Sequence, residues 1–414
     1  MCRHISPPDG HRIDVKAELR NSLDRLVTRY PPAALAPSGG LYAGLLSVVF
    51  LLWKLDKLIP QEHLNHGFTI KYWLDAYWTQ AKRLERALLG QAGMASFKIR
   101  PWRCGVGEDA IVYTALHVVF ALEAGQTQSE AEVRAFCQAV KQVVGSASIS
   151  QVRKHGKPAS NEWLYGRAGT LYLLRMIRRV AGQSGQYATL VPDIDECIHA
   201  VIEEILSVPR PWMWHGKPYL GAVHGSAGIV SQVVQSMQAI DLQDQRLLDS
   251  MQADVERILD LQMPSGNWPS SIPTSNAHPH QDRLVQFCHG SPGIVACLKQ
   301  IQSAYPSLSN RISTAISCAE ADILSRGWLT KEPCLCHGAS GNALALGTKA
   351  RRMSFLQGAT ERSIQRMEET GELNISDSPE GLYTGVAGRV WVWALCSTDE
   401  DLQGLGAFLG FDDV

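Results

Sequence analysis

Two Cys-His-Gly triplets occur in this 414-residue chain, one beginning at Cys288 and the other at Cys336. Two thiolates and one imidazole, from Cys288, Cys336 and His337, suit zinc and leave its fourth tetrahedral position open, as in catalytic sites. These three residues are the predicted metal ligands. A competing set adds Cys334 as a fourth ligand, but Cys334 lacks the register before the glycine that Cys288 and Cys336 share.

Histidines recur at one position relative to the glycines. His224 precedes its glycine just as His289 and His337 precede theirs. A single such histidine is explained by a hydrogen-bonded place in the core, whereas three in register favour a common pocket. Because the ordinary pKa of histidine lies near neutrality, His224 and His289 are candidates for general acid or base chemistry beside a metal-bound thiol.

The glycines themselves form a recurring motif that an apolar run always follows. Since glycine permits unusual backbone angles and close contacts, each copy predicts a helix whose first turn begins at or near the second glycine. The clear copies are Gly166-Arg-Ala-Gly169, Gly225-Ser-Ala-Gly228, Gly290-Ser-Pro-Gly293, Gly338-Ala-Ser-Gly341 and Gly385-Val-Ala-Gly388.

Two weaker copies precede these, at residues 104–108 and 39–44, and bring the number of repeats to seven. The spacing leaves room for two helices per repeat. Apolar helix pairs cannot bury their faces alone, so the repeats must stack, and seven pairs are predicted to close into an all-helical ring. Residues 37–414 are assigned to this single domain, and residues 1–36 to an N-terminal extension that is ordered at most in part.

If every turn lies at the same end of the ring, the residues beside the glycines converge there, together with the positive ends of the helix dipoles. Loops are predicted at residues 182–185, 209–221 and 264–282. The last is long and polar, which is more typical of a functional loop than of a linker.

Composition narrows the class of partner. The chain has 45% hydrophobic residues, and its 39 Lys and Arg nearly balance its 40 Asp and Glu, so nothing favours nucleic acid or an acidic membrane. Ten cysteines without a signal-like leader suggest a reducing cytoplasmic location. The most apolar run, residues 41–53, is too short to span a bilayer and is predicted to be a buried helix.

The glycine turns, above all Cys-His-Gly-Ser-Pro-Gly from Cys288 and Cys-Leu-Cys-His-Gly-Ala-Ser-Gly-Asn from Cys334, resemble those of lanthionine synthetase C-like proteins of the eukaryotic type. The stretches 162–172, 267–271 and 282–290 strengthen the resemblance, which covers all seven repeats. It implies an α/α toroid, one zinc ion on Cys288, Cys336 and His337, and glutathione binding. It also implies the addition of a thiol to dehydroalanine or dehydrobutyrine.

The resemblance also suggests roles for residues around the metal. His224 matches the acid/base histidine of the family, and His289 stands where the bacterial enzymes have a tyrosine. Glu162 aligns with an acidic position and would orient His224, although a glutamate there could also simply favour a helix start.

Three basic residues form the expected substrate-binding set. Lys331 matches a lysine proposed to contact glutathione, and Arg167 and Arg283 lie in the matching motifs. For Lys331, a solvated surface charge is an equal alternative. The chain departs from the family at Phe287, which replaces a tryptophan and is expected to reshape the pocket wall. It also lacks Lys or Arg between Arg366 and Arg389, where a second basic anchor for glutathione is expected.

Three functions are consistent with these features. The first is a zinc-dependent transferase that adds glutathione to dehydroamino-acid residues of a peptide or protein. The second is a protein that binds glutathione for redox signalling, or acts as a receptor, without turnover. The third, which has least support, is a peptide lanthionine cyclase.

Overall fold

The computed structural model describes residues 12–63, 67–91, 93–273, 282–376, 378–398 and 407–414. Within these residues the regular secondary structure is helical, and β-type pairing occurs only as isolated bridges. This confirms the predicted all-α class.

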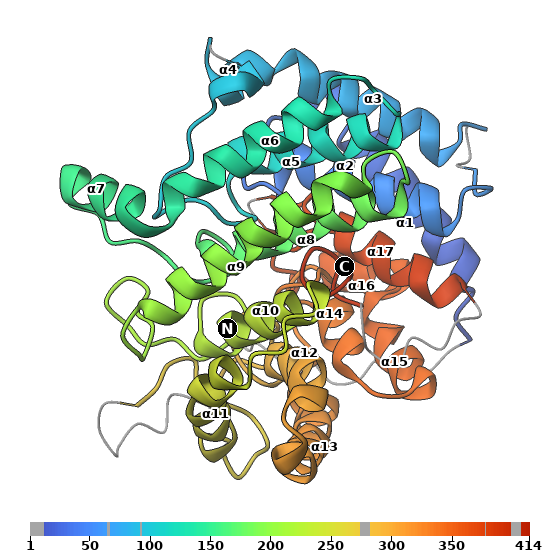
Figure 1. The fold of residues 1–414 in the computed structure, drawn as a ribbon. Helices are drawn as coiled ribbons and strands as arrows, with labels where there is room; N and C mark the ends of the chain where they lie inside the picture. Colours follow the sequence, from blue (N-terminus) through green and yellow to red (C-terminus); the bar gives the residue numbers. More distant parts are fainter. Residues whose placement is uncertain (1–11, 64–66, 92, 274–281, 377, 399–406) are drawn as a thin grey trace.

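Seven helices form an inner ring in which each contacts the next and α17 contacts α2, so that the ring is closed (Figure 1). Nearly every residue of α2 and α17 is buried, as expected for helices that are apolar on all sides. This arrangement confirms the predicted toroid. The inner helices are α2 (Gly44–Leu58), α5 (Asp109–Glu123), α8 (Arg167–Gln183), α10 (Ser226–Ala239), α12 (Ser291–Ile301), α14 (Ala339–Ala345) and α17 (Val386–Ser397).

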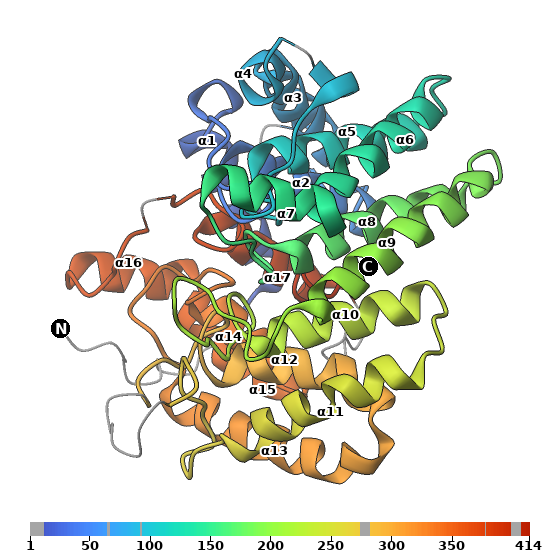
Figure 2. The same cartoon turned by 60° about the vertical axis from the view of Figure 1, so that its left-hand side comes forward.

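A second layer of helices packs outside the ring, and Figure 2 shows α11 and α13 lying outside α10 and α12. Outer helices bury one face only; α11 buries Leu247, Met251, Val255 and Ile258, which follow the helical period. The outer helices are α3 (Ile70–Arg83), α6 (Ser129–Val140), α9 (Val191–Ser207), α11 (Gln245–Asp260) and α13 (Ser309–Arg326), with shorter α4 (Glu85–Leu89), α7 (Gly145–His155), α15 (Lys349–Phe355) and α16 (Glu361–Glu369).

The outer partner of α17 comes from the start of the chain. Helix α1 (Val15–Arg29), within the predicted N-terminal extension, packs on α17. Arg25 pairs with Glu361 at 2.6 Å and with Glu368 at 3.0 Å. The described part of the extension therefore shares its core with the ring.

The inner helices begin directly after the first glycine of each clear turn, two residues before the second glycine. The second glycine is required by close packing inside the first helical turn. A Cβ at Gly228 would lie 1.8 Å from the carbonyl oxygen of Ala222, and one at Gly293 would lie 1.9 Å from that of Phe287. No larger residue fits at either position.

Backbone hydrogen bonds join consecutive turns at this end of the ring. The amide of Cys288 donates to the carbonyl of Cys336 at 3.3 Å, Cys336 to Tyr383 at 3.0 Å, and Tyr383 to Tyr42 at 2.9 Å. On the other side, the amide of Trp163 donates to the carbonyl of Val223 at 3.1 Å. Residues at equivalent repeat positions are thereby held side by side, which confirms the predicted convergence of the turns.

The middle of the ring holds the last residues of the chain, 407–414, here called the C-terminal plug (Figure 1). Sequence analysis did not anticipate it. Its backbone carbonyls accept hydrogen bonds from side chains of several inner helices and turns, and Phe408 and Phe411 are buried. These donors are Trp163 to Gly410, Gln232 to Phe411, Tyr383 to Leu409 and Trp391 to Ala407.

The apolar run at residues 41–53 lies in the turn before α2 and in α2 itself, where it is almost entirely buried, as predicted. In the described part of the chain, none of the helices has the length and apolar character needed to cross a membrane.

Candidate active site

Glu162 and His224 form a hydrogen-bonded pair across two neighbouring turns. The Nδ1 atom of His224 lies 2.8 Å from a carboxylate oxygen of buried Glu162. The same carboxylate accepts hydrogen bonds from the backbone amides of Leu164 and Tyr165 at 2.9 and 2.6 Å. Because an ionised carboxylate only accepts hydrogen bonds, Nδ1 carries the hydrogen, and Nε2 of the neutral ring keeps its lone pair.

Aromatic rings fix the plane of His224. Trp214 stacks on it with ring centroids 3.7 Å apart and an interplanar angle of 6°, and the ring of Tyr165 lies nearly parallel to it at 6.4 Å. Trp214 enters a tight turn in which His215 and Gly216 both have positive φ, and its amide and carbonyl bond to Lys217. This loop lies inside the predicted loop 209–221, but the role of Trp214 was not predicted.

His289 connects the histidine side of the site to the cysteine side. Its ring centroid is 6.1 Å from that of His224, and it directly follows Cys288. Burial lowers the pKa of His289, and the neighbouring His224 lowers it further, against the opposing effect of Cys288. Its Nδ1 is buried and has no hydrogen-bond partner among the described residues.

The pKa values of the neighbouring Cys288 and Cys336 thiols are shifted in opposite directions. The pKa of Cys288 lies well below the ordinary thiol value because Cys336 and His337 hydrogen-bond to its sulfur. Burial raises the pKa of Cys336, and the adjacent Cys288 sulfur raises it further. Burial alone would lower the pKa of His337, but Cys334 and Cys288 outweigh it and raise the value to about 10.

The contacts among Cys288, Cys336 and His337 bear on whether these side chains could bind the predicted zinc ion. In the described residues, no three His, Cys, Asp or Glu side chains are placed so that they could hold a metal ion as they stand. The donor set nevertheless fits zinc, since Cys288 contacts both Cys336 and His337 and its thiolate is already favoured. Cys334 also lies within hydrogen-bonding reach of His337, so the four-ligand alternative remains available.

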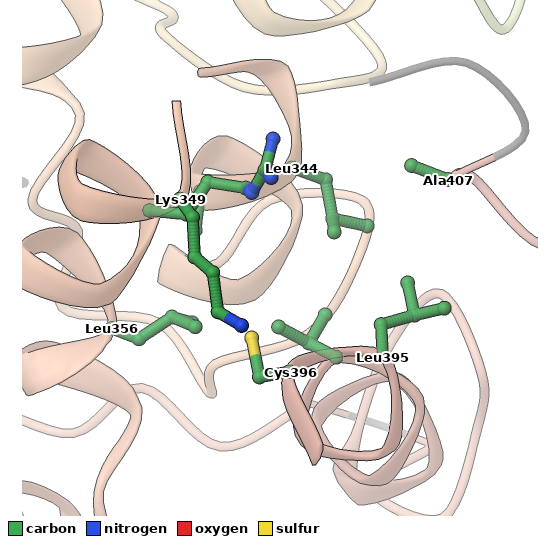
Figure 3. Close-up of a pocket in the computed structure, with 9 residues that line it drawn as sticks. Leu344, Lys349, Leu356, Leu395, Cys396 and Ala407 are labelled. Atoms are coloured by element: carbon green, nitrogen blue, oxygen red, sulfur yellow. The ribbon is translucent and has the colours of Figure 1, made fainter. Parts of the chain in front are cut away.

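A pocket between α14, α15 and α17 contains a half-buried cysteine, Cys396, that has no cysteine or histidine beside it in the pocket lining (Figure 3). The side chains of Cys396 and Lys349 point toward each other there. Burial raises the pKa of Cys396 to about 11, although Arg352 and Lys349 oppose the shift. Burial likewise raises the pKa of Cys104 to about 12. A depressed thiol pKa at Cys288 therefore reflects its own neighbours rather than a general property of the core.

Arg167 lies outside the pocket. Its side chain is 1% exposed and donates to the carbonyl of Val143, to Asn161, to Ser148 and to Glu204 at 2.6 to 2.9 Å. Four of the five N–H donors of this buried guanidinium are thus engaged within the protein, and they tie α8 to its neighbours.

Lys331 and Arg283 are both exposed. Lys331 lies in the loop before Cys334, where its backbone bridges to that of Asn374. Arg283 follows Asp282, which pairs with Arg326 at 2.7 Å. Both positions leave the charged groups available to solvent, so their contact with a substrate stays a prediction.

The motif around Asn267 and the substitution at Phe287 have structural explanations. Asn267 accepts a hydrogen bond from the amide of Ser291 at 2.8 Å and donates to Asp282, so it caps α12. Phe287 was expected to reshape the pocket wall. Its side chain is fully buried and stacks on Phe408 of the C-terminal plug with ring centroids 4.6 Å apart. Residues 274–281 of the predicted loop lie outside the described residues.

The chain matches the family model described as lanthionine synthetase C-like protein over residues 38–405. A Danio rerio protein named glutathione S-transferase LANCL1 is 30% identical over 248 residues, which cover 56% of this chain and 58% of that protein. An Arabidopsis thaliana protein named LanC-like protein GCL1 is 26% identical over 256 residues, with 56% and 54% covered. Each alignment spans little more than half of the relative. Because the family model covers most of the chain, this protein belongs to the lanthionine synthetase C-like family.

Proposed function

We propose that the protein is a zinc-dependent thiol transferase that adds glutathione to dehydroalanine or dehydrobutyrine residues in peptides or proteins. One observation carries the proposal: the Glu162–His224 pair lies beside His289, which adjoins the Cys288–Cys336 sulfurs. This arrangement supports a centre in which thiol activation by the cysteines and proton transfer by His224 would occur side by side. The name of the zebrafish relative supports glutathione as the thiol.

Cys288, Cys336 and His337 would hold the zinc ion. When bound, zinc would lower the pKa of the incoming thiol, which makes the thiolate available at neutral pH. The fourth ligand position would be the one that the thiol occupies.

The addition has no leaving group. It needs two proton transfers, one that removes the proton of the thiol and one that delivers a proton to the α-carbon. The sulfur forms a bond to the β-carbon of the alkene, the π electrons move to the α-carbon as an enolate, and a proton must reach that carbon. Nε2 of His224 accepts the thiol proton and returns it, while Glu162 holds the ring and stabilises its protonated form. His289, whose ring centroid lies 6.1 Å from that of His224, would share this proton transfer.

The test is glutathione addition to a peptide that contains dehydroalanine, followed by mass spectrometry on zinc-loaded protein. Wild type should form the adduct, and His224→Ala should be slower by about 10²- to 10⁴-fold, the usual contribution of a general acid or base. His199→Ala, at a half-exposed histidine of α9, is the matched control and should leave the rate unchanged. Glutathione binding without any adduct from wild type would overturn the enzymatic proposal and favour the signalling alternative.

A further inference from the structure

Each sulfur of the Cys288–Cys336 pair accepts a hydrogen bond from a different neutral side chain. The hydroxyl of Tyr42 donates to Sγ of Cys336 at 2.7 Å, and Nε2 of Gln286 donates to Sγ of Cys288 at 3.0 Å. Neither donor was singled out from the sequence. Tyr42 belongs to the weak first turn, and Gln286 lies two residues before the first predicted ligand.

The closed ring fixes the orientation of the Tyr42 hydroxyl toward Cys336. Its aromatic ring stacks on Tyr383 with centroids 5.1 Å apart and an interplanar angle of 7°. The backbone of Tyr383 is bonded on one side to Tyr42 and on the other to Cys336. The first and last repeats therefore fix this phenol against a sulfur of the sixth repeat, which requires the toroid to be closed.

Gln286 is held in a similar way from the other side. Its side chain is buried, and its backbone amide donates to the carbonyl of His289 at 3.3 Å. The two donors thus come from separate turns and reach separate sulfurs. Buried donors of this kind, in contact with metal ligands, are known to orient the ligands and to tune the metal.

We infer that Tyr42 and Gln286 are positioning residues that set how much negative charge the two cysteine sulfurs pass to the metal. The inference rests on the proposed function. A hydrogen bond to a thiolate draws electron density onto the donor, so the sulfur gives less to the ion. An ion that keeps more of its positive charge lowers the pKa of an incoming thiol further. Tyr42 has one hydroxyl hydrogen, which it donates to Cys336. The sulfur of the incoming thiol therefore receives no hydrogen bond from Tyr42, and its negative charge is not reduced in the same way.

Cobalt-substituted protein gives a direct readout, because cobalt thiolates absorb through charge transfer from sulfur to metal. Tyr42→Phe removes one donor but keeps the ring that stacks on Tyr383, so the fold should persist. Losing the donor raises the energy of the sulfur lone pair, and the charge-transfer band should move to longer wavelength. Gln286→Met should shift the band in the same direction, and the double variant should shift it further than either single change.

Tyr383→Phe is the matched control. It also removes a phenolic hydroxyl from the stacked pair, but that hydroxyl donates to the carbonyl of Leu409 and not to a sulfur. Its band should coincide with that of wild type. In the zinc form, Tyr42→Phe should keep its metal and slow glutathione addition by about 10-fold, at the lower end of effects seen for such supporting residues.

The outcomes separate this inference from the proposed function. An unshifted band in both Tyr42→Phe and Gln286→Met, or an equal shift in Tyr383→Phe, would overturn the inference even if wild type catalyses the addition. A shifted band in protein that forms no adduct would support the inference and reject the proposed reaction. Absence of any charge-transfer band in cobalt-treated wild type would reject the thiolate metal site and the inference together.

Discussion

Two neighbouring regions inside this toroid lie among the same helices but differ in chemistry. At the turn end, titratable side chains stand side by side, from the Glu162–His224 pair to the Cys288–Cys336 sulfurs. Next to them, the C-terminal plug is held by buried aromatic rings and by side chains that donate to its backbone carbonyls. The turn end presents reactive side chains, whereas the C-terminal plug leaves few polar groups of the described residues without a partner.

Adjacent residues of one turn serve these two regions. Glu162 bonds His224, whereas the next residue, Trp163, donates to Gly410 of the plug. Cys288 lies in the sulfur cluster, whereas Phe287 before it stacks on the plug. A turn residue therefore cannot be assigned to the site from its motif alone, because the residue next to it can be structural, as Trp163 and Phe287 are.

The largest expected effect is from deleting residues 407–414. The deletion removes Phe408 and Phe411 and strands the buried donors of Trp163, Gln232 and Tyr383. Each stranded donor costs about 1–3 kcal/mol, and the total approaches the 5–15 kcal/mol that stabilises a typical domain. The deletion should therefore abolish the cooperative thermal transition seen by circular dichroism.

A milder variant, Phe411→Ala, should lower the free energy of unfolding by about 3–5 kcal/mol. A wild-type melting temperature in both variants would show that the plug is dispensable.

Arg167→Met tests whether a residue in a turn motif is structural. It leaves Glu204 without its buried partner at 2.9 Å, and breaking such a pair costs about 3–5 kcal/mol. Denaturant unfolding should show this loss, whereas KM for glutathione in the remaining folded protein should not change. A raised KM with unchanged stability would instead return Arg167 to the substrate-binding set.

A smaller effect is expected from Asp412→Asn, because the amide can keep the hydrogen bond from the amide of Phe408. Burial raises the pKa of Asp412 well above its ordinary value of 3.8, and Asp413 raises it further. The folded state therefore holds this proton more tightly than the unfolded state, and stability falls as the pH rises above that ordinary value. Asn cannot ionise, so the stability of Asp412→Asn relative to wild type should grow with pH over this range. Urea unfolding across a pH series measures this, and a constant difference would contradict the assignment.

The smallest effect is expected at the exposed basic residues of the turn end. Lys331→Ala and Arg283→Ala should leave the melting temperature unchanged. If either contacts glutathione, KM should rise by at most about fivefold, since exposed charge pairs contribute up to about 1 kcal/mol. Isothermal titration calorimetry measures the affinity of each variant for glutathione directly, without turnover. Unchanged affinity in both variants would remove them from the expected substrate-binding set.

The sequence predicts the ring and the reactive turns because both leave local marks. Gly228 and Gly293 are demanded by carbonyl contacts within their own turns, and the repeat register places Cys288 beside Cys336. Trp214 was missed because an irregular loop brings it onto His224. The plug was missed because Phe411 and its neighbours contact inner helices far apart in the chain, and no periodic pattern encodes such contacts. Tyr42 was missed because its turn is degenerate in sequence, although its place in the ring is the same.

The most direct test of the account is the metal content of purified protein, measured by plasma mass spectrometry. Wild type should contain about one zinc ion per chain, because Cys288, Cys336 and His337 are the three proposed ligands of a single ion. Cys288→Ala, Cys336→Ala and His337→Ala should each lose it, while Cys396→Ala, at the half-buried cysteine of a different pocket, should retain it. A wild type that stays free of metal after incubation with zinc would contradict the central claim.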